Sequence, residues 1–282
     1  AFDIWAEGGR CRRLALGADP RDPRALAESV ETAFDAAWAG QHAATDDGDG
    51  HVFVTGLAGS GLEQAAALLS TLRGANVFLD SSFLPDAVTR LVGPVPDRST
   101  RLKAAARIDP RTLSNAFDDA VRQATDGSAV RMIDVSSSHV WLLGLVRAAF
   151  PAAKIVHLRR DPVDHCLDLF TTLFPRGHAW SYALDDLARY FASYHRLMGH
   201  WRRNLPSNFL DLDYELLVSD TGAAARRVAE HLGISEAEFR EPREAVSRTL
   251  SVRGPGVGRG RAYERQLAPR VARLRADGVP VS

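Results

Sequence analysis

The sequence predicts a three-layer α/β fold, in which a central parallel sheet is covered by helices on both faces. Short apolar runs alternate along the chain with segments whose apolar residues recur at helical spacing. The runs do not alternate strictly between polar and apolar residues, which is typical of parallel strands buried on both faces. The predicted strands are HVFVTG, AVRMIDV, KIVHLRR and SNFLDLDY.

The clearest helical pattern spans residues 184–201, where apolar side chains fall along one side of the predicted helix. These residues are Leu184, Leu187, Phe191, Tyr194, Leu197, Met198 and Trp201. We interpret the stripe as core packing against the sheet. Ligands of open parallel sheets bind outside the carboxyl ends of the strands, so candidate site residues are expected there.

Two segments organise the chain of 282 residues. Residues 1–50 form an N-terminal extension with a basic segment, a predicted helix and the polar, Gly-rich linker QHAATDDGDG. Residues 51–282 form the main domain, which is long enough to bury one large core.

Charge and cysteine content narrow the range of functions. The 35 Lys and Arg residues balance 35 Asp and Glu, so no overall field attracts nucleic acid or an anionic membrane, and any anion site is local. Cys11 and Cys166 are far apart, which argues against a disulfide scaffold and favours the cytoplasm. No apolar run approaches the roughly 20 residues of a membrane span. His178, His195 and His200 lack carboxylate or Cys partners at metal-ligand spacing, so no metal is expected.

A glycine-rich turn follows the first predicted strand. In VFVTGLAGSGLEQ, Gly56, Gly59 and Gly61 surround Ser60 just before a predicted helix. The free N–H groups and the dipole at a helix start favour an anion, as in P-loop proteins. The Lys of the G-x-x-x-x-G-K-[ST] pattern is absent, so an ordinary ATPase or GTPase is not predicted. A turn that uses glycine only to reverse the chain stays open as the alternative.

A second motif lies in KIVHLRRDPVDHCLDLF. A strand delivers Arg159 and Arg160 to its carboxyl end, and DPVD begins the next helix. Two guanidinium groups at a strand end can bind phosphate through paired hydrogen bonds. In the alternative interpretation, one arginine pairs with Asp161 or Asp164 and only fixes the turn.

Together the two motifs resemble the bacterial sulfotransferase family, and the likeness continues in order over nearly the whole chain. The resemblance implies a sulfotransferase fold with a P-loop-like strand, loop and helix. It also implies a transferase that moves a sulfuryl group, without metal, from 3′-phosphoadenosine 5′-phosphosulfate (PAPS) to an acceptor. The expected acceptor is a hydroxyl-bearing small molecule, glycan or peptide. Similar domains often follow tetratricopeptide repeats, so an adjoining repeat domain is an expected partner.

The resemblance also assigns roles to individual positions. The general base of the family falls on Asp80. The donor PAPS, or its product adenosine 3′,5′-bisphosphate (PAP), is expected at a set of loop and strand-end residues: Gly56, Gly59, Ser60, Gly61, Leu62, Arg159, Arg160, Asp168, Ser251 and Arg253. His139 is a further acid or base candidate from its position after a strand, although a lone His before an apolar helix is more often structural. The basic, Gly-rich stretch VRGPGVGRGRAYERQ predicts a loop on the nucleotide or substrate side.

The sequence departs from the family pattern at the donor site. The loop Arg of the family falls on Gly59, its two Thr on Leu62 and Glu63, its Lys on Val135 and its Ser on Asp168. A like-charge pair about 4 Å apart costs roughly 4 kcal/mol at an effective dielectric constant near 20, so added carboxylates oppose phosphate binding. Three functions therefore stay open: PAPS-dependent sulfuryl transfer, a non-catalytic binding module, and a changed donor on the same fold.

Overall fold

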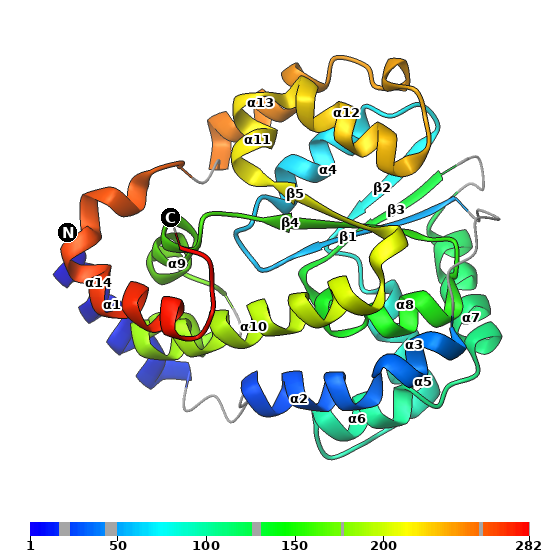
Figure 1. The fold of residues 1–282 in the computed structure, drawn as a ribbon, viewed down its shortest axis with the longest axis horizontal. Coiled ribbons are helices and arrows are strands. Elements are labelled where there is room, and N and C mark those ends of the chain that lie inside the picture. The colour runs from blue at the N-terminus through cyan, green and yellow to red at the C-terminus, as the bar shows by residue number, and fades with distance from the viewer. Residues whose placement is uncertain (17–22, 43–49, 126–130, 176–177, 254–255, 282) are drawn as a thin grey trace.

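A five-stranded parallel sheet forms the centre of the computed structural model, which describes residues 1–16, 23–42, 50–125, 131–175, 178–253 and 256–281 (Figure 1). The strand order is β2-β3-β1-β4-β5, and every pairing is parallel. The strands are β1 (His51–Gly56), β2 (Ala75–Leu79), β3 (Arg131–Val135), β4 (Lys154–Arg159) and β5 (Phe209–Asp213). The predicted three-layer α/β fold is confirmed, and the four predicted runs correspond to β1, β3, β4 and β5. Edge strand β2 was not predicted, because its half-exposed residues give only a short apolar run.

The sheet register brings the carboxyl ends of the strands to one edge. Gly56 is opposite Leu158, Val135 is opposite Val54 and Leu79, and Arg159 is opposite Asp213. Loops that follow β1, β3 and β4 therefore begin side by side. This edge is where the candidate site residues were expected.

One face of the sheet is covered by α4 (Leu62–Ser70), α11 (Tyr214–Ser219), α12 (Thr221–Leu232) and α13 (Pro242–Arg253), which form the upper layer in Figure 1. A core cluster joins this layer to the strands, with Leu68 of α4 and Val228 of α12 buried against Val54 and Leu158. Strands with buried residues on both faces explain why their sequences read as continuous apolar runs.

The opposite face is covered by α5 (Phe83–Val92), α7 (Pro110–Ala124), α8 (Leu143–Ala149) and α10 (Leu184–Asn204). Outside them lie α2 (Pro23–Ala33), α3 (Ala36–Gln41) and α6 (Arg98–Ala105). The apolar stripe of α10 is buried from Leu187 to Trp201, so its interpretation as core packing is confirmed. Val30 and Phe34 of the N-terminal extension belong to the same core, because their side chains are fully buried in it.

Helices α1 (Phe2–Leu16), α9 (Pro162–Thr171) and α14 (Glu264–Ala276) gather beyond the carboxyl ends of the strands, at the left of Figure 1. The ring of Phe2 contacts those of Phe170 on α9 and Tyr263 just before α14. Short 3-10 turns complete the described chain: η1 (Ser137–Trp141), η2 (Ala179–Tyr182), η3 (Pro206–Asn208), η4 (Glu236–Glu238) and η5 (Arg259–Tyr263). Among the described helices, none combines the length and the apolar character that crossing a membrane would require.

Candidate anion site at the carboxyl ends of the strands

The glycine loop between β1 and α4 is a tight turn. Gly61 caps α4 with φ +103°, and a side chain on it would lie 2.3 Å from the ring of Tyr214. A Cβ on Gly56 would lie 2.3 Å from Oγ of Ser60. Ser60 is fully buried, and within the described residues its Oγ has no hydrogen-bond partner. The loop is thus a tight glycine-rich turn between a strand and a helix, with one buried hydroxyl that no described residue partners.

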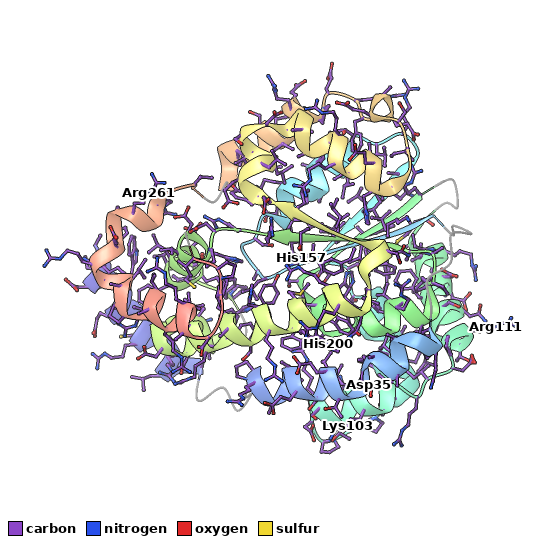
Figure 2. All side chains as sticks on the ribbon, viewed as in Figure 1. Asp35, Lys103, Arg111, His157, His200 and Arg261 are labelled. Carbon is purple, nitrogen blue, oxygen red and sulfur yellow. The ribbon has the colours of Figure 1, made fainter. Side chains whose placement is uncertain are left out.

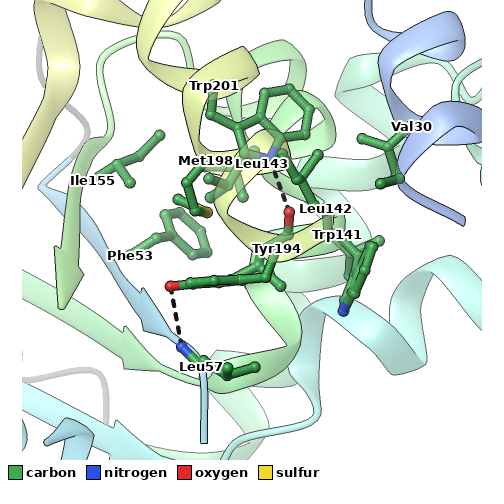
Figure 3. Packing of buried hydrophobic residues seen from close by; sticks show 14 of the residues in the cluster. Val30, Phe53, Leu57, Trp141, Leu142, Leu143, Ile155, Tyr194, Met198 and Trp201 are labelled. Atoms are coloured by element: carbon green, nitrogen blue, oxygen red, sulfur yellow. Dashed lines mark hydrogen bonds between the residues drawn. The ribbon is translucent and has the colours of Figure 1, made fainter. Parts of the chain in front are cut away.

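Three buried side chains fix the outline of this loop. The Tyr194 hydroxyl accepts the N–H of Leu57 at 3.2 Å, as the dashed line in Figure 3 shows. Nε2 of His165 donates to the carbonyl of Ala58 at 2.7 Å, and burial lowers the pKa of His165 to about 3, so its ring is neutral at neutral pH. Arg160 donates to the carbonyl of Gly59 at 3.1 Å. The loop is therefore held by α9, α10 and the end of β4.

A buried hydrogen-bond chain stands behind Tyr194. Its hydroxyl lies 2.5 Å from Nε2 of His157 on β4, and Nδ1 of His157 lies 2.6 Å from Asp211 on β5. The Asp211 carboxylate also accepts two hydrogen bonds from Arg202. Because an ionised carboxylate only accepts, Nδ1 of His157 carries the proton and Nε2 accepts from Tyr194. Figure 2 shows His157 between β4 and α10.

The pKa shifts of His157, Tyr194 and Asp211 follow from their burial and from their hydrogen bonds to one another. Burial lowers the pKa of His157 and raises that of Tyr194, which keeps both groups neutral. Burial also opposes ionisation of Asp211, but hydrogen bonds from His157 and Arg202 outweigh it and lower the pKa of that carboxyl. A cavity of about 650 Å³ borders His157, Tyr194, Asp211 and Arg202.

Arg160 is the residue that connects the glycine loop to the predicted nucleotide-side loop. Its buried guanidinium lies 2.6 Å from Oδ2 of Asp168 and donates to the carbonyl of Gly256 at 2.8 Å. The same group stacks 5.1 Å from the ring centre of Tyr214. The other oxygen of Asp168 lies 2.6 Å from Arg259. A carboxylate of the protein therefore sits between two arginines at the predicted 3′-phosphate position.

Arg159, the other predicted phosphate ligand, extends away from Arg160. It makes a two-pronged ion pair with Asp213 on β5, which raises the pKa of Arg159 further. Successive side chains of a strand point to opposite faces, so the two arginines diverge. The side chain of Asp161 accepts the first N–H groups of α9, and Asp164 accepts the N–H groups of Gly258 and Gly260, while Arg159 pairs with Asp213 and Arg160 with Asp168.

The two acidic candidates of the loop region lie on the surface. Glu63 is exposed in the first turn of α4, whereas Leu62 beside it is buried. Asp80 is exposed after edge strand β2, with φ +55°, and its N–H donates to the carbonyl of Val135 at 2.8 Å. Since β3 lies between β2 and β1 in the sheet, Asp80 is separated from the glycine loop by one strand.

His139 lies inside the core. Its ring is fully buried, Nε2 lies 3.3 Å from Oδ2 of Asp134, and the ring meets Phe53 edge to face. Both side chains of the His139–Asp134 pair are inaccessible to solvent, which agrees with the structural alternative for this histidine.

Two predicted donor-site residues remain, together with the expectation that the chain binds no metal. Ser251 and Arg253 belong to the last turn of α13, but their side chains lie outside the described part of the structure. Across the described ranges, no group of three or more His, Cys, Asp or Glu side chains is arranged to hold a metal ion.

The hydrogen bonds that connect Asp211, His157 and Tyr194 were not predicted from the sequence. The available signal was a polar residue inside each of two apolar strands, in KIVHL and FLDLD. In the sheet, His157 and Asp211 are register partners, which the sequence alone does not give.

The parallel sheet, with helices on both faces and a glycine loop between β1 and α4, defines a three-layer α/β domain. A family model described as "Sulfotransferase family" matches residues 68–238, more than half of the chain, and the chain belongs to this family. The matched range begins after the glycine loop and ends before Ser251.

The chain is similar to solved structures of bacterial sulfotransferases. The sulfotransferase domain from the Synechococcus PCC 7002 olefin synthase aligns with a TM-score of 0.52 at 18% identity, over 81% of this chain and 96% of that chain. Sulfotransferase STF1 from Mycobacterium tuberculosis H37Rv aligns with a TM-score of 0.45 at 16% identity, over 86% of this chain and 81% of that one. An uncharacterized protein of Aquifex aeolicus (strain VF5) is 23% identical over 189 residues, which are 59% of this chain and 24% of the relative. The chain thus spans about a quarter of that relative's length.

Proposed function

We propose that this chain is a non-catalytic member of the sulfotransferase family, in which the carboxylate of Asp168 takes the place of the 3′-phosphate of PAPS. One observation carries the proposal: Asp168 lies 2.6 Å from both Arg160 and Arg259. The resemblance to the family implies that Arg160 and the residue at position 168 bind that phosphate. In this chain the anion comes from the protein.

Phosphate binding would have to break or crowd this cluster. Breaking a buried ion pair by removing one partner costs about 3–5 kcal/mol. If Asp168 stayed in place, its repulsion of a phosphate at about 4 Å would cost roughly 4 kcal/mol. Either route weakens binding by a factor of several hundred, since about 1.4 kcal/mol is tenfold in affinity.

Three positions at the sulfuryl end of the site also depart from the family pattern. Gly59, Leu62 and Val135 stand where the family pattern has Arg, Thr and Lys, and Val135 is fully buried. Catalysis of group transfer depends on fixed donors aimed at the oxygen where charge develops. Without them, binding alone would not accelerate transfer. We infer that such a module acts by binding, and an adjoining repeat domain is the partner expected from the sequence.

PAPS-dependent transfer to a hydroxyl acceptor is the second candidate. It is favoured by Ser60 and Gln64, which are buried one helical turn apart around the start of α4, with Oγ and Nε2 unpartnered among the described residues. These groups and the loop amides would hold the 5′-phosphosulfate. Asp80 would take the acceptor proton while the acceptor oxygen bonds to sulfur and the bond from sulfur to the bridging oxygen breaks, releasing PAP.

Calorimetric titration of the full chain with PAP separates the two candidates. The wild type should show a Kd above about 1 mM, and Asp168→Ser, which restores the serine of the family pattern, should bind at least about tenfold more tightly. The matched control is Asp119→Ser on α7, where an exposed carboxylate is paired with Arg122. A wild-type Kd in the micromolar range would refute the proposal and support PAPS use, and Arg160→Ala should then abolish binding. No gain in Asp168→Ser would show that the carboxylate does not block the site.

A further inference from the structure

Residues 256–260, named here the strap, lie against α9 and over Arg160. The N–H groups of Gly258 and Gly260 both donate to the carboxylate of Asp164, at 2.6 Å for Gly260. The carbonyl of Gly256 accepts from Arg160, and Arg259 pairs with Asp168. Two carboxylates one helical turn apart on α9 thus hold the strap by its backbone and by one side chain.

Glycine lets the strap lie this close to α9. Gly258 has φ +78°, a conformation that other residues rarely adopt. A Cβ on Gly260 would lie 2.7 Å from Cγ1 of Val163 and 3.1 Å from Oδ1 of Asp164. A side chain at that position would therefore lift the strap from the helix.

Arg160 links the strap to the glycine loop. Its guanidinium donates to the carbonyl of Gly59 on one side and to that of Gly256 on the other, while Asp168 neutralises it. Its Nε is buried and has no hydrogen-bond partner within the described residues. A displacement of Asp168 would therefore disturb three segments at once: the glycine loop, α9 and the strap.

We propose that the strap is a lid over the anion site, held shut in the free chain because Asp168 stands in for an anionic ligand. The inference rests on the proposed closed donor site and adds how that site stays closed. The carboxylate of Asp168 attracts the guanidinium groups of both Arg160 and Arg259. Because Arg259 belongs to the strap and Asp168 to α9, this attraction holds the strap against α9. Without that carboxylate, Arg160 and Arg259 repel one another and the strap is released. A phosphate-type anion of sufficient charge then closes it again.

Hydrogen exchange measured by mass spectrometry on the full chain tests the lid, in peptides that contain Gly258 and Gly260. Asp168→Ser should speed exchange of these amides by about tenfold or more, although both amides bind Asp164 and neither binds Asp168. Unchanged exchange would overturn the proposal, because the strap would then be held by Asp164 alone. Amides of β1 and β4 serve as the folding control, and Asp119→Ser as the matched control variant.

A second variant covers the case in which Asp168→Ser does not fold. Arg259→Gln leaves the buried pair of Arg160 and Asp168 intact and removes only the exposed half of the cluster. It should also speed exchange of the strap amides, by at least about threefold. Equal rates in Arg259→Gln and the wild type would contradict a lid drawn shut by this ion pair.

Inorganic pyrophosphate is the probe for the stand-in role of Asp168. At roughly 10 mM, pyrophosphate should slow hydrogen exchange of the strap amides in Asp168→Ser, back toward the wild-type rate. The same slowing is expected in Asp168→Asn, and both variants keep Arg160. Sodium chloride of equal ionic strength should not slow the exchange. No slowing would refute the anion-responsive lid. This result can be told apart from that of the PAP titration. Micromolar binding of PAP by the wild type would refute the proposed non-catalytic function, whereas the exchange rates of the strap amides test the lid.

Discussion

The hydroxyl of Tyr194 lies 2.5 Å from Nε2 of His157, deep between α10 and the sheet. The same hydroxyl accepts the N–H of Leu57, the first residue of the glycine loop. One phenol oxygen therefore ties a covering helix, a central strand and the candidate site together. Both hydrogen bonds are buried, so loss of this hydroxyl leaves two buried polar groups without their partner.

Tyr194→Phe should destabilise the protein by about 1–3 kcal/mol, because it leaves the N–H of Leu57 and Nε2 of His157 without their buried partner. Urea unfolding of both proteins measures the difference. Tyr263→Phe is the control, since its ring keeps its contacts with Phe2 and Trp5 and the change should cost below about 0.5 kcal/mol. A loss in Tyr194→Phe no larger than in the control would refute the role of this hydroxyl.

His165 should make stability depend on pH. Burial lowers its pKa to about 3 in the folded chain, while the unfolded chain keeps an ordinary value near 6.5. The unfolded state therefore binds more protons between these values, so the stability is present above about pH 6.5 and is lost as pH falls, by up to about 1.4 kcal/mol per pH unit for this group.

His165→Gln removes the titrating ring and can keep a donor near the carbonyl of Ala58. Between about pH 6 and pH 4, the slope of its unfolding free energy against pH should be smaller than that of the wild type by about 1.4 kcal/mol per unit. Urea titrations at a series of pH values give both slopes. Parallel curves would contradict a neutral, buried His165 in the folded state.

Much of the fold could be predicted because each buried strand carries its own signal. A continuous apolar run predicts a strand that is covered on both faces, and the apolar stripe of α10 from Leu187 to Trp201 predicts a helix packed on a core. Both predictions use only neighbouring residues in the sequence. The half-exposed strand β2 has no such signal. Pairing across the sheet is likewise absent from local sequence, which is why the contact between His157 and Asp211 could not be predicted.

The sequence could predict where the candidate site residues lie in the fold, but not the contacts that they make. The glycine loop and Arg160 meet at the carboxyl edge of the sheet, as their motifs indicated. Alternation along a strand could also have shown that Arg159 and Arg160 diverge. What Asp168 does depends on its neighbours in space, since Arg259 approaches it from 91 residues further along the chain.

Gly61 and Gly59 should differ in their tolerance of alanine. Both have positive φ, which costs a non-glycine residue roughly 1–2 kcal/mol. A Cβ on Gly59 would keep ordinary contacts of 3.7 Å, whereas on Gly61 it would lie 2.3 Å from the Tyr214 ring. Gly59→Ala should therefore lose about 1–2 kcal/mol, and Gly61→Ala at least about 2 kcal/mol more, because the ring must move.

Urea unfolding of the two variants measures this difference, and Tyr214→Leu provides the cross-check. In the Tyr214→Leu background, the extra cost of Gly61→Ala should shrink while that of Gly59→Ala stays the same. Equal costs for the two glycine variants in the wild-type background would show that the loop relaxes around Gly61.

The two cysteines should react at very different rates. Cys11 is exposed on α1, whereas Cys166 is buried in α9, and burial raises the pKa of its thiol to about 12. Since the thiolate is the reactive form, a disulfide reagent such as Ellman's reagent should label Cys11 rapidly in the native chain and Cys166 only on unfolding. Cys11→Ser should remove the fast phase. A second fast phase in native protein, or one that survives Cys11→Ser, would mean that α9 opens readily, in conflict with a helix clamped by the strap and the glycine loop.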